Sequence, residues 1–138
     1  MGRCAVILRE IMSTRLVTVE YDDALAAVKE IFDAAKFHHL LVVERGRLHG
    51  VISDRDLLRA LSPYVGTLSE TARDAATLNK RAHQVMSRDP ITLGPEAAVA
   101  DAVRLLLSHD ISCIPVIDAA GKPIGIVSWR DVLRALPC

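Results

Sequence analysis

One short segment occurs twice in this sequence. Residues 50–57 read GVISDRDL and residues 125–132 read GIVSWRDV, and the copies continue into LRAL at 58–61 and 133–136. In both copies a glycine and two apolar residues predict a strand, and Ser-x-x-Asp has the spacing of a capping box at a helix start. Main-chain N–H groups at such a start lack partners within the helix and attract anions. We therefore expect two equivalent strand-to-helix junctions.

The similarity between the two halves extends beyond the junctions. Met12-Ser13 is repeated as Met86-Ser87, and Gly50 is repeated as Gly125 after one inserted residue. An internal repeat of this length decides the architecture of a chain, because each copy folds into the same unit. The chain is read as a tandem duplication, with a first repeat at 1–61, a connector at 62–81 and a second repeat at 82–138.

Each repeat predicts the element order β-α-β-β-α. The expected strands are 16–19, 40–43 and 51–52 in the first repeat and 91–93, 114–117 and 126–127 in the second. Helices are expected to begin at Asp22-Asp23 and at Pro95-Glu96, because proline and acidic residues favour a first helical turn. A half this small cannot cover both faces of its own sheet. We expect an α/β (α+β) fold whose repeats pack sheet to sheet with pseudo-twofold symmetry.

Composition argues against several classes of function. Seventeen basic and 17 acidic side chains give a formal charge of zero, so the basic surface typical of nucleic-acid binding is missing. Arg9 and Glu10 interrupt the apolar N-terminal residues, and no apolar run reaches membrane-spanning length. Cys4, Cys113 and Cys138 lack metal-ligand spacing and are expected to be reduced thiols. The sequence predicts a cytoplasmic protein that binds neither nucleic acid nor membrane.

Three motifs define the repeat: Met-Ser near its start, an apolar-Pro-Val strand at 114–116, and Gly-h-h-Ser-x-x-Asp before its last helix, where h is apolar. A β-α-β-β-α unit with these motifs resembles the CBS domain, and a tandem pair resembles the Bateman module. The resemblance covers nearly all of the chain outside the connector. It implies a regulatory module that binds an adenosine-containing ligand, such as AMP, ADP, ATP or S-adenosylmethionine, in clefts between paired repeats. No other cofactor is implied.

The resemblance also implies the ligand contacts. Serine and aspartate of each junction hold the ribose hydroxyls, which assigns Ser53 and Asp56 to one cleft and Ser128 and Asp131 to the other. A carboxylate can accept two hydrogen bonds from a cis-diol, so this role is chemically reasonable. The residues expected around the base are Leu16, Val17, Thr18, His38, Val51, Pro90, Ile91, Thr92, Ser112 and Ile126.

A positive group must offset each aspartate if a phosphate is to bind beside it. Arg55 and Arg130 precede the two aspartates, and a guanidinium offers paired, planar donors to phosphate. We expect both arginines to contact phosphate. Helix capping alone is the alternative explanation of Ser-x-x-Asp, with a contribution of about 1 kcal/mol, but it leaves the repeated arginine unexplained.

The two repeats differ at two places. Leu41 stands where the second repeat has Pro115, and residues 37–39 read FHH where residues 111–113 read ISC. Because these bulky residues belong to the cleft expected around Asp131, that cleft is predicted to be narrower. The cleft of Asp56 is predicted to be more open.

Two other functions remain open. One is a ligand-independent scaffold that forms a homodimer through the helices at 57–61 and 132–136. The other is an enzyme acting on nucleotides, which lacks support because neither junction serine lies in Gly-x-Ser-x-Gly. No catalytic residue is predicted, and no metal site, since adjacent His38 and His39 point to opposite faces of an extended segment. Because no catalytic or transport domain accompanies the repeats, a regulated partner, unknown from sequence, is expected to act in trans.

Overall fold

The computed structural model describes residues 7–34 and 37–136 and has a mixed α+β fold. Its contacts divide the chain into two compact units, neither of which is one continuous stretch. Unit 1 combines the described residues of 7–16, 46–48 and 90–136, and unit 2 combines those of 17–45 and 49–89. The units therefore do not coincide with the two sequence repeats. Each one takes a short N-terminal segment from the other repeat.

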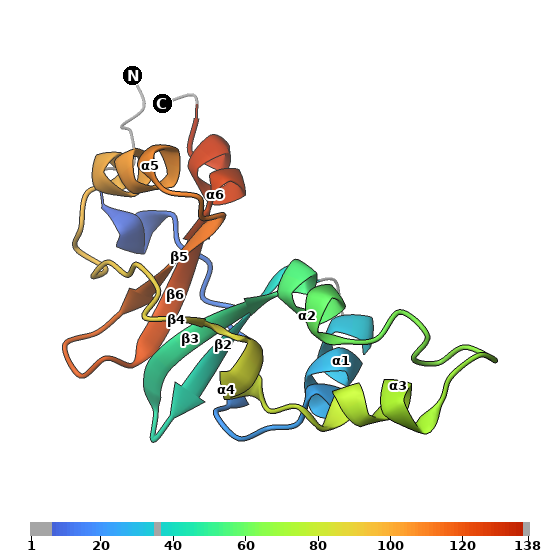
Figure 1. The fold of residues 1–138 in the computed structure, drawn as a ribbon. Helices are drawn as coiled ribbons and strands as arrows, with labels where there is room; N and C mark the ends of the chain where they lie inside the picture. Colours follow the sequence, from blue (N-terminus) through green and yellow to red (C-terminus); the bar gives the residue numbers. More distant parts are fainter. Residues whose placement is uncertain (1–6, 35–36, 137–138) are drawn as a thin grey trace. The chain divides into compact units, whose positions relative to one another are not determined.

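Unit 2 contains a four-stranded sheet in the order β1-β2-β3-β4 (Figure 1). Its elements are β1 (Thr18–Glu20), α1 (Leu25–Ala34), β2 (His39–Glu44), β3 (Arg47–Ser53), α2 (Asp54–Ala60), α3 (Ala72–Ala76), a 3-10 helix (Thr77–Asn79), α4 (Ala82–Val85) and β4 (Ser87–Arg88). Strand β1 is parallel to β2, with Thr18 opposite Leu41, and β4 is antiparallel to β3. Arg45 and Gly46 join β2 to β3 with φ of 53° and 77°, as a two-residue hairpin turn with the strand twist requires.

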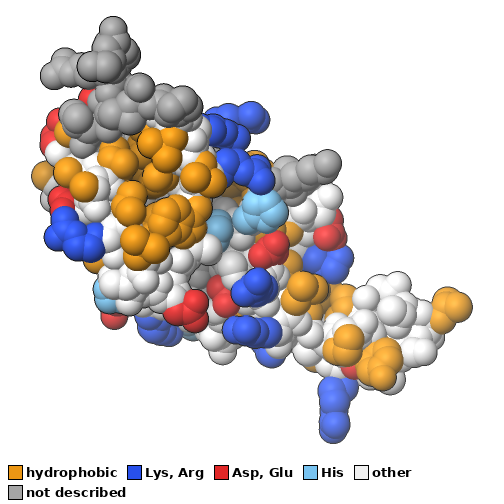
Figure 2. All heavy atoms as spheres, turned by 90° about the horizontal axis from the view of Figure 1, so that it is seen from above, with side chains coloured by type: hydrophobic (Ala, Val, Ile, Leu, Met, Phe, Trp, Pro, Cys, Tyr) orange, Lys and Arg blue, Asp and Glu red, His pale blue; other side chains and the backbone are white. Residues whose placement is uncertain are grey.

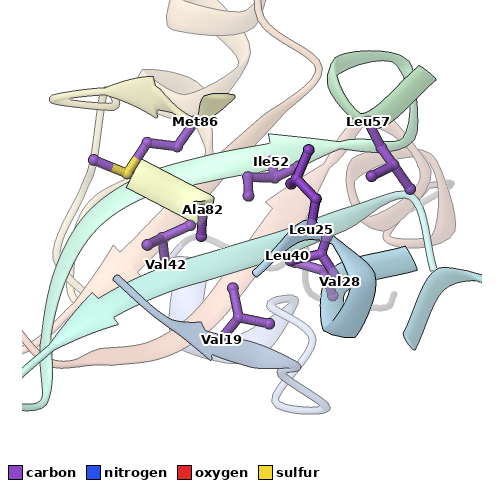
Figure 3. Packing of buried hydrophobic residues seen from close by; sticks show 9 residues of the cluster. All are labelled: Val19, Leu25, Val28, Leu40, Val42, Ile52, Leu57, Ala82 and Met86. Carbon is purple, nitrogen blue, oxygen red and sulfur yellow. The ribbon is translucent and has the colours of Figure 1, made fainter. Parts of the chain in front are cut away.

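The core of unit 2 is aliphatic apart from Met86 (Figure 3). Its buried members are Val19, Leu25, Val28, Leu40, Val42, Ile52, Leu57, Ala82 and Met86. They come from three strands and from α1, α2 and α4, so the sheet is anchored by helices on one face. Burial of branched aliphatic side chains, at roughly 25 cal/mol per Å² of apolar surface, is the main favourable contribution to such a core.

Unit 1 is built on a hairpin of β5 (Cys113–Ile117) and β6 (Pro123–Ser128), with α5 (Val99–Ser108), α6 (Trp129–Arg134) and a 3-10 helix (Leu8–Glu10) (Figure 1). Its core is again aliphatic and consists of Leu8, Ala102, Leu106, Ile114, Val116, Val127 and Val132. The segment before α5 adds one parallel bridge to the hairpin, from Leu93 to Val116.

Two exchanged segments, which we call arms, explain why the units differ from the repeats. The first arm, residues 7–16, belongs to repeat 1 but lies in unit 1, where Ser13 and Ile126 exchange two main-chain hydrogen bonds of 2.9 Å. The second arm, residues 82–89, opens repeat 2 but lies in unit 2. In both units the arm methionine packs against the junction glycine of the other repeat: Met12 against Gly125 and Met86 against Gly50. The repeated Met-Ser and Gly motifs are therefore contact partners.

Three expected element boundaries were wrong. Helix α1 begins at Leu25 because Asp23 closes a turn, its carboxylate accepting from the Glu20 N–H at 2.8 Å. Helix α5 begins at Val99 because the first arm uses the carbonyls of Pro95 and Ala97, each at 2.9 Å. The strand expected at 91–93 is reduced to the single bridge at Leu93.

The connector is held by its own hydrogen bonds. Its middle is helical over α3 and the following 3-10 helix. The Asp74 carboxylate accepts from the Ser62 hydroxyl at 2.6 Å and from the Thr71 N–H at 2.8 Å, and these bonds lower the pKa of Asp74. Leu68 and Tyr64 near the connector tip are exposed. In the described parts of the chain, no helix is long and apolar enough to cross a lipid bilayer.

Candidate functional site

The first junction, residues 50–57, is where β3 runs into α2 in unit 2. Ser53 is extended, with φ −89° and ψ 165°, so that its side chain can reach the first helical turn. Its hydroxyl accepts from the Asp56 N–H at 3.0 Å, and the Asp56 Oδ2 accepts from the Ser53 N–H at 2.9 Å. This reciprocal pair is the capping box that the spacing predicted.

The second junction, residues 125–132, is where β6 runs into α6 in unit 1. Asp131 Oδ2 accepts from the Ser128 N–H at 2.8 Å and from the Ser128 hydroxyl at 3.2 Å. Arg134, one turn further along, lies 3.9 Å from Asp131 Oδ1. Asp131 is buried, at 9% exposure, whereas Asp56 is half-buried. The second carboxylate is therefore more firmly tied into its own unit.

The two predicted phosphate-binding arginines lie on the first turns of these helices. Arg55 and Arg130 are both exposed. Within residues 7–34 and 37–136, neither guanidinium takes part in an ion pair or hydrogen bond that the structure records. Both cations are thus presented to solvent beside an anchored aspartate, which suits a group that binds an anion.

A histidine pair flanks the first junction. The Asp54 N–H donates to the His38 carbonyl at 3.1 Å, and His38 Nδ1 lies 3.4 Å from Asp54 Oδ2. Partial burial lowers the pKa of His39, Asp54 opposes that shift, His38 adds to it, and Asp56 opposes it weakly. The pairing of His38 with Asp54 was not foreseen. Its only sequence signal was that both residues depart from the second repeat, which has Ser112 and Trp129.

The residues predicted around the base are distributed over both units. Val17, Thr18, His38 and Val51 lie in unit 2, and Leu16, Pro90, Ile91, Thr92, Ser112 and Ile126 lie in unit 1. Val51 is buried in β3 opposite Ser87, Ile126 pairs with Ser13, and Thr18 and Ser112 are exposed. The residues predicted around the base thus come partly from one unit and partly from the other, and their role at the base stays a prediction.

Several residues at which the two repeats differ are buried or half-buried within their own units. Leu41 and Pro115 are both fully buried, so this exchange occurs inside the sheets. Trp129 is half-buried against the core of unit 1. Burial raises the pKa of the Cys113 thiol to about 12, which makes it a structural cysteine. Cys4 and Cys138 lie outside the described residues.

Metal coordination finds no support in the described residues, which contain no group of three or more histidine, cysteine and acidic side chains placed to hold an ion. The chemistry available at the junctions is therefore that of hydrogen bonds and charge. Each offers a fixed carboxylate and an exposed guanidinium one residue before it.

Comparisons with known proteins agree with this architecture. The chain is 32% identical over 133 residues to a CBS domain-containing protein of Dictyostelium discoideum, covering 95% of this chain and 91% of that one. Among solved structures it is similar to CBSX2 in complex with AMP, at a TM-score of 0.78, 28% identity and coverage of 95% and 96%. It also shares its fold with the CBS domain pair of MJ0100 in complex with 5-methylthioadenosine and S-adenosyl-L-methionine, at a TM-score of 0.76, 23% identity and coverage of 95% and 99%.

A family model for the CBS domain matches residues 8–63 and again residues 82–138. These two matches contain both junctions and leave out most of the connector. Together with the α-β-β-α order that both repeats share, they show that the chain belongs to the CBS domain family and carries a tandem pair of its repeats.

Proposed function

We propose that this chain is a regulatory module that binds an adenosine-containing ligand and transmits its presence to a partner protein in trans in the cytoplasm. The observation that carries the proposal is the duplicated junction, in which an anchored aspartate and an exposed arginine recur together. Capping requires the serine and the aspartate but not the arginine. A ribose phosphate uses all three groups.

The ligand class is supported by the comparison with CBSX2, whose structure holds AMP and which matches nearly the full length of this chain. In our proposal Ser53 and Asp56 hold the ribose in one site, and Ser128 and Asp131 hold it in the other. Arg55 and Arg130 bind phosphate. The base lies against the residues of the other repeat that the sequence assigned to it.

Ligand binding is tested by thermal unfolding of the full chain with AMP, ATP and S-adenosylmethionine at millimolar concentration. A ligand that binds only the native state raises the melting temperature by mass action. We expect the increase to disappear when Asp56→Ala and Asp131→Ala are combined.

The matched control combines Asp22→Ala and Asp101→Ala, which remove one exposed acid from each unit outside the junctions. This control protein should keep the full ligand-induced increase. If no adenosine ligand raises the melting temperature of the unchanged chain, the proposal is wrong.

A ligand-independent homodimer is the second candidate, and exposed leucines favour it. Leu107 on α5, Leu133 on α6 and the following Leu136 are 72%, 62% and 55% exposed. Figure 2 looks down on the helical end of unit 1, and hydrophobic side chains gather there. Such a group of exposed apolar side chains is typical of a protein–protein contact.

Sedimentation velocity separates the two candidates. A scaffold would remain dimeric in the combined Asp56→Ala and Asp131→Ala protein and would become monomeric in Leu133→Glu plus Leu136→Glu. A dimer that forms or dissociates with ligand would instead belong to the sensing function.

A further inference from the structure

The two junctions carry different charges, and the difference lies at one position. Residue 54 is aspartate in the first junction, and its counterpart in the second is Trp129. Asp54 Oδ1 accepts from the Arg55 N–H at 2.9 Å. The carboxylate thus occupies a main-chain donor of the first helical turn, beside the arginine proposed to hold phosphate.

The charge of Asp54 is only partly offset by its surroundings. His38 lies 3.4 Å from its Oδ2, with both side chains more than half exposed, so the pair is a solvent-screened contact. His39 is kept neutral at neutral pH, because burial lowers its pKa. Residues 54–56 carry two carboxylates, Asp54 and Asp56, and one guanidinium, Arg55, so acidic groups exceed basic groups by one in this helical turn.

The second junction has no such acid. Trp129 presents an indole ring that packs against the core of unit 1, and Asp131 is balanced by Arg130 beside it. Arg134 lies 3.9 Å from Asp131 as well. A negatively charged ligand tail therefore meets a more positive environment here than at the first junction.

We propose that the two sites select ligands by the charge of the tail: the Asp56 site takes an adenosine ligand with a neutral or cationic tail, and the Asp131 site takes a phosphorylated one. The inference rests on the proposed function and adds a ligand class for each site. Asp54 acts through its charge, because its carboxylate lies next to the arginine that we propose to hold phosphate and repels a negatively charged tail.

The test is isothermal titration of the full chain carrying Asp131→Ala, which leaves the Asp56 site, or Asp56→Ala, which leaves the Asp131 site. Adenosine, S-adenosylmethionine, AMP and ATP are the probes, and they differ mainly in tail charge. In the Asp131→Ala protein we expect affinity to fall from S-adenosylmethionine to ATP, and in the Asp56→Ala protein we expect the reverse order.

Adding Asp54→Asn to the Asp131→Ala protein removes the charge while keeping the side-chain shape. It should tighten AMP binding by about fivefold per unit of ligand charge and leave adenosine binding unchanged, since only charged tails interact with Asp54 at this range. Asp22→Asn in the same background is the matched control, because it removes an exposed acid of unit 2 that pairs with His83 away from the junction. The control should change neither affinity.

If Asp131→Ala prevents folding, Asp54→Asn in the unchanged chain gives the same information, because only the site that prefers uncharged tails should gain affinity for AMP. The inference is overturned if the Asp56 site binds ATP more tightly than S-adenosylmethionine, or if Asp54→Asn shifts adenosine and AMP equally. Absence of binding by all four probes at both sites would instead remove the proposed function itself.

Discussion

The two junctions share a main-chain frame but differ in how firmly their aspartates are enclosed. Asp131 is buried, whereas Asp56 is half-buried and has a second carboxylate, Asp54, two residues before it. The duplication thus preserved the hydrogen bonds that set the helix start and varied the groups around them. The hydrogen bonds that both junctions share are those that folding needs. The side chains that differ between the junctions are those that can select a ligand.

The largest expected difference between the two junctions is the loss of unfolding free energy when the glycine in contact with the arm methionine is replaced by alanine. A Cβ at residue 50 would lie 2.5 Å from Met86 Sδ and 2.8 Å from the Ser87 carbonyl oxygen, which is fixed in the β3–β4 pairing. The three atoms nearest to a Cβ at residue 125 all belong to the Met12 side chain, with Cγ at 2.9 Å. Gly50→Ala should therefore destabilise by about 3 kcal/mol and Gly125→Ala by about half as much, as measured by urea unfolding.

Shortening the methionine tests this explanation. Met12→Ala should remove most of the cost specific to Gly125→Ala, because the two atoms nearest to the new methyl group are Met12 Sδ and Cγ, which alanine lacks. Met86→Ala should rescue Gly50→Ala only in part, because the Ser87 carbonyl remains. Equal rescue in both units, read from the two double-mutant cycles, would contradict the packing asymmetry.

The next difference is the stability cost of losing each junction carboxylate in the absence of ligand. Asp56→Ala removes a half-buried capping interaction and should cost about 1 kcal/mol. Asp131→Ala should cost about twice that, because this carboxylate is buried and accepts from the Ser128 hydroxyl as well as from the Ser128 N–H. Urea unfolding of both variants decides the order. Equal costs would mean that the burial of Asp131 has no energetic consequence.

The duplicated fold was predictable from the sequence because it rests on periodic, local signals. Ser53 and Ser128 cap their helices as the spacing required, and the tandem mixed fold was confirmed. The exchange of arms was not predicted, because Met12 and Gly125 are far apart in sequence and the repeat pattern does not say which copy packs on which. The start of α5 was misplaced for the same reason, since the first arm uses the carbonyl of Pro95.

Only those parts of the site that depend on residues close together in sequence were predictable. The aspartates and arginines follow from the motif, and the structure places them on the first helical turns. The pairing of His38 with Asp54 could not be predicted, because it depends on how β2 begins beside the end of β3. Local spacing therefore identified which residues recur, while the tertiary structure determined the charge around each of them.

A smaller difference between the repeats lies in the residue at the start of the strand that follows the first long helix of each repeat. This residue is His39 in the first repeat and Cys113 in the second. Burial raises the pKa of Cys113 to about 12 from 9.0, so at neutral pH its thiolate fraction falls by about a thousandfold. We expect Cys113 to resist iodoacetamide in the folded protein and to react readily in urea. Peptide mapping separates it from Cys4 and Cys138, and rapid native labelling of Cys113 would show that unit 1 opens locally.

The smallest effect is a pH dependence from His39. Its pKa is lowered from 6.5 in the folded protein, so below about pH 6.5 the unfolded chain binds more protons and stability falls as the pH falls. Cys113 acts at the other end of the scale, where stability falls as the pH rises above about 9. His39→Leu should therefore reduce the difference in unfolding free energy between about pH 7.5 and about pH 5.5. Asp54 and Asp56 oppose the lowering of the His39 pKa, so Asp54→Asn should enlarge the loss of unfolding free energy between about pH 7.5 and about pH 5.5. A smaller loss in that variant would contradict the influence of Asp54 on His39.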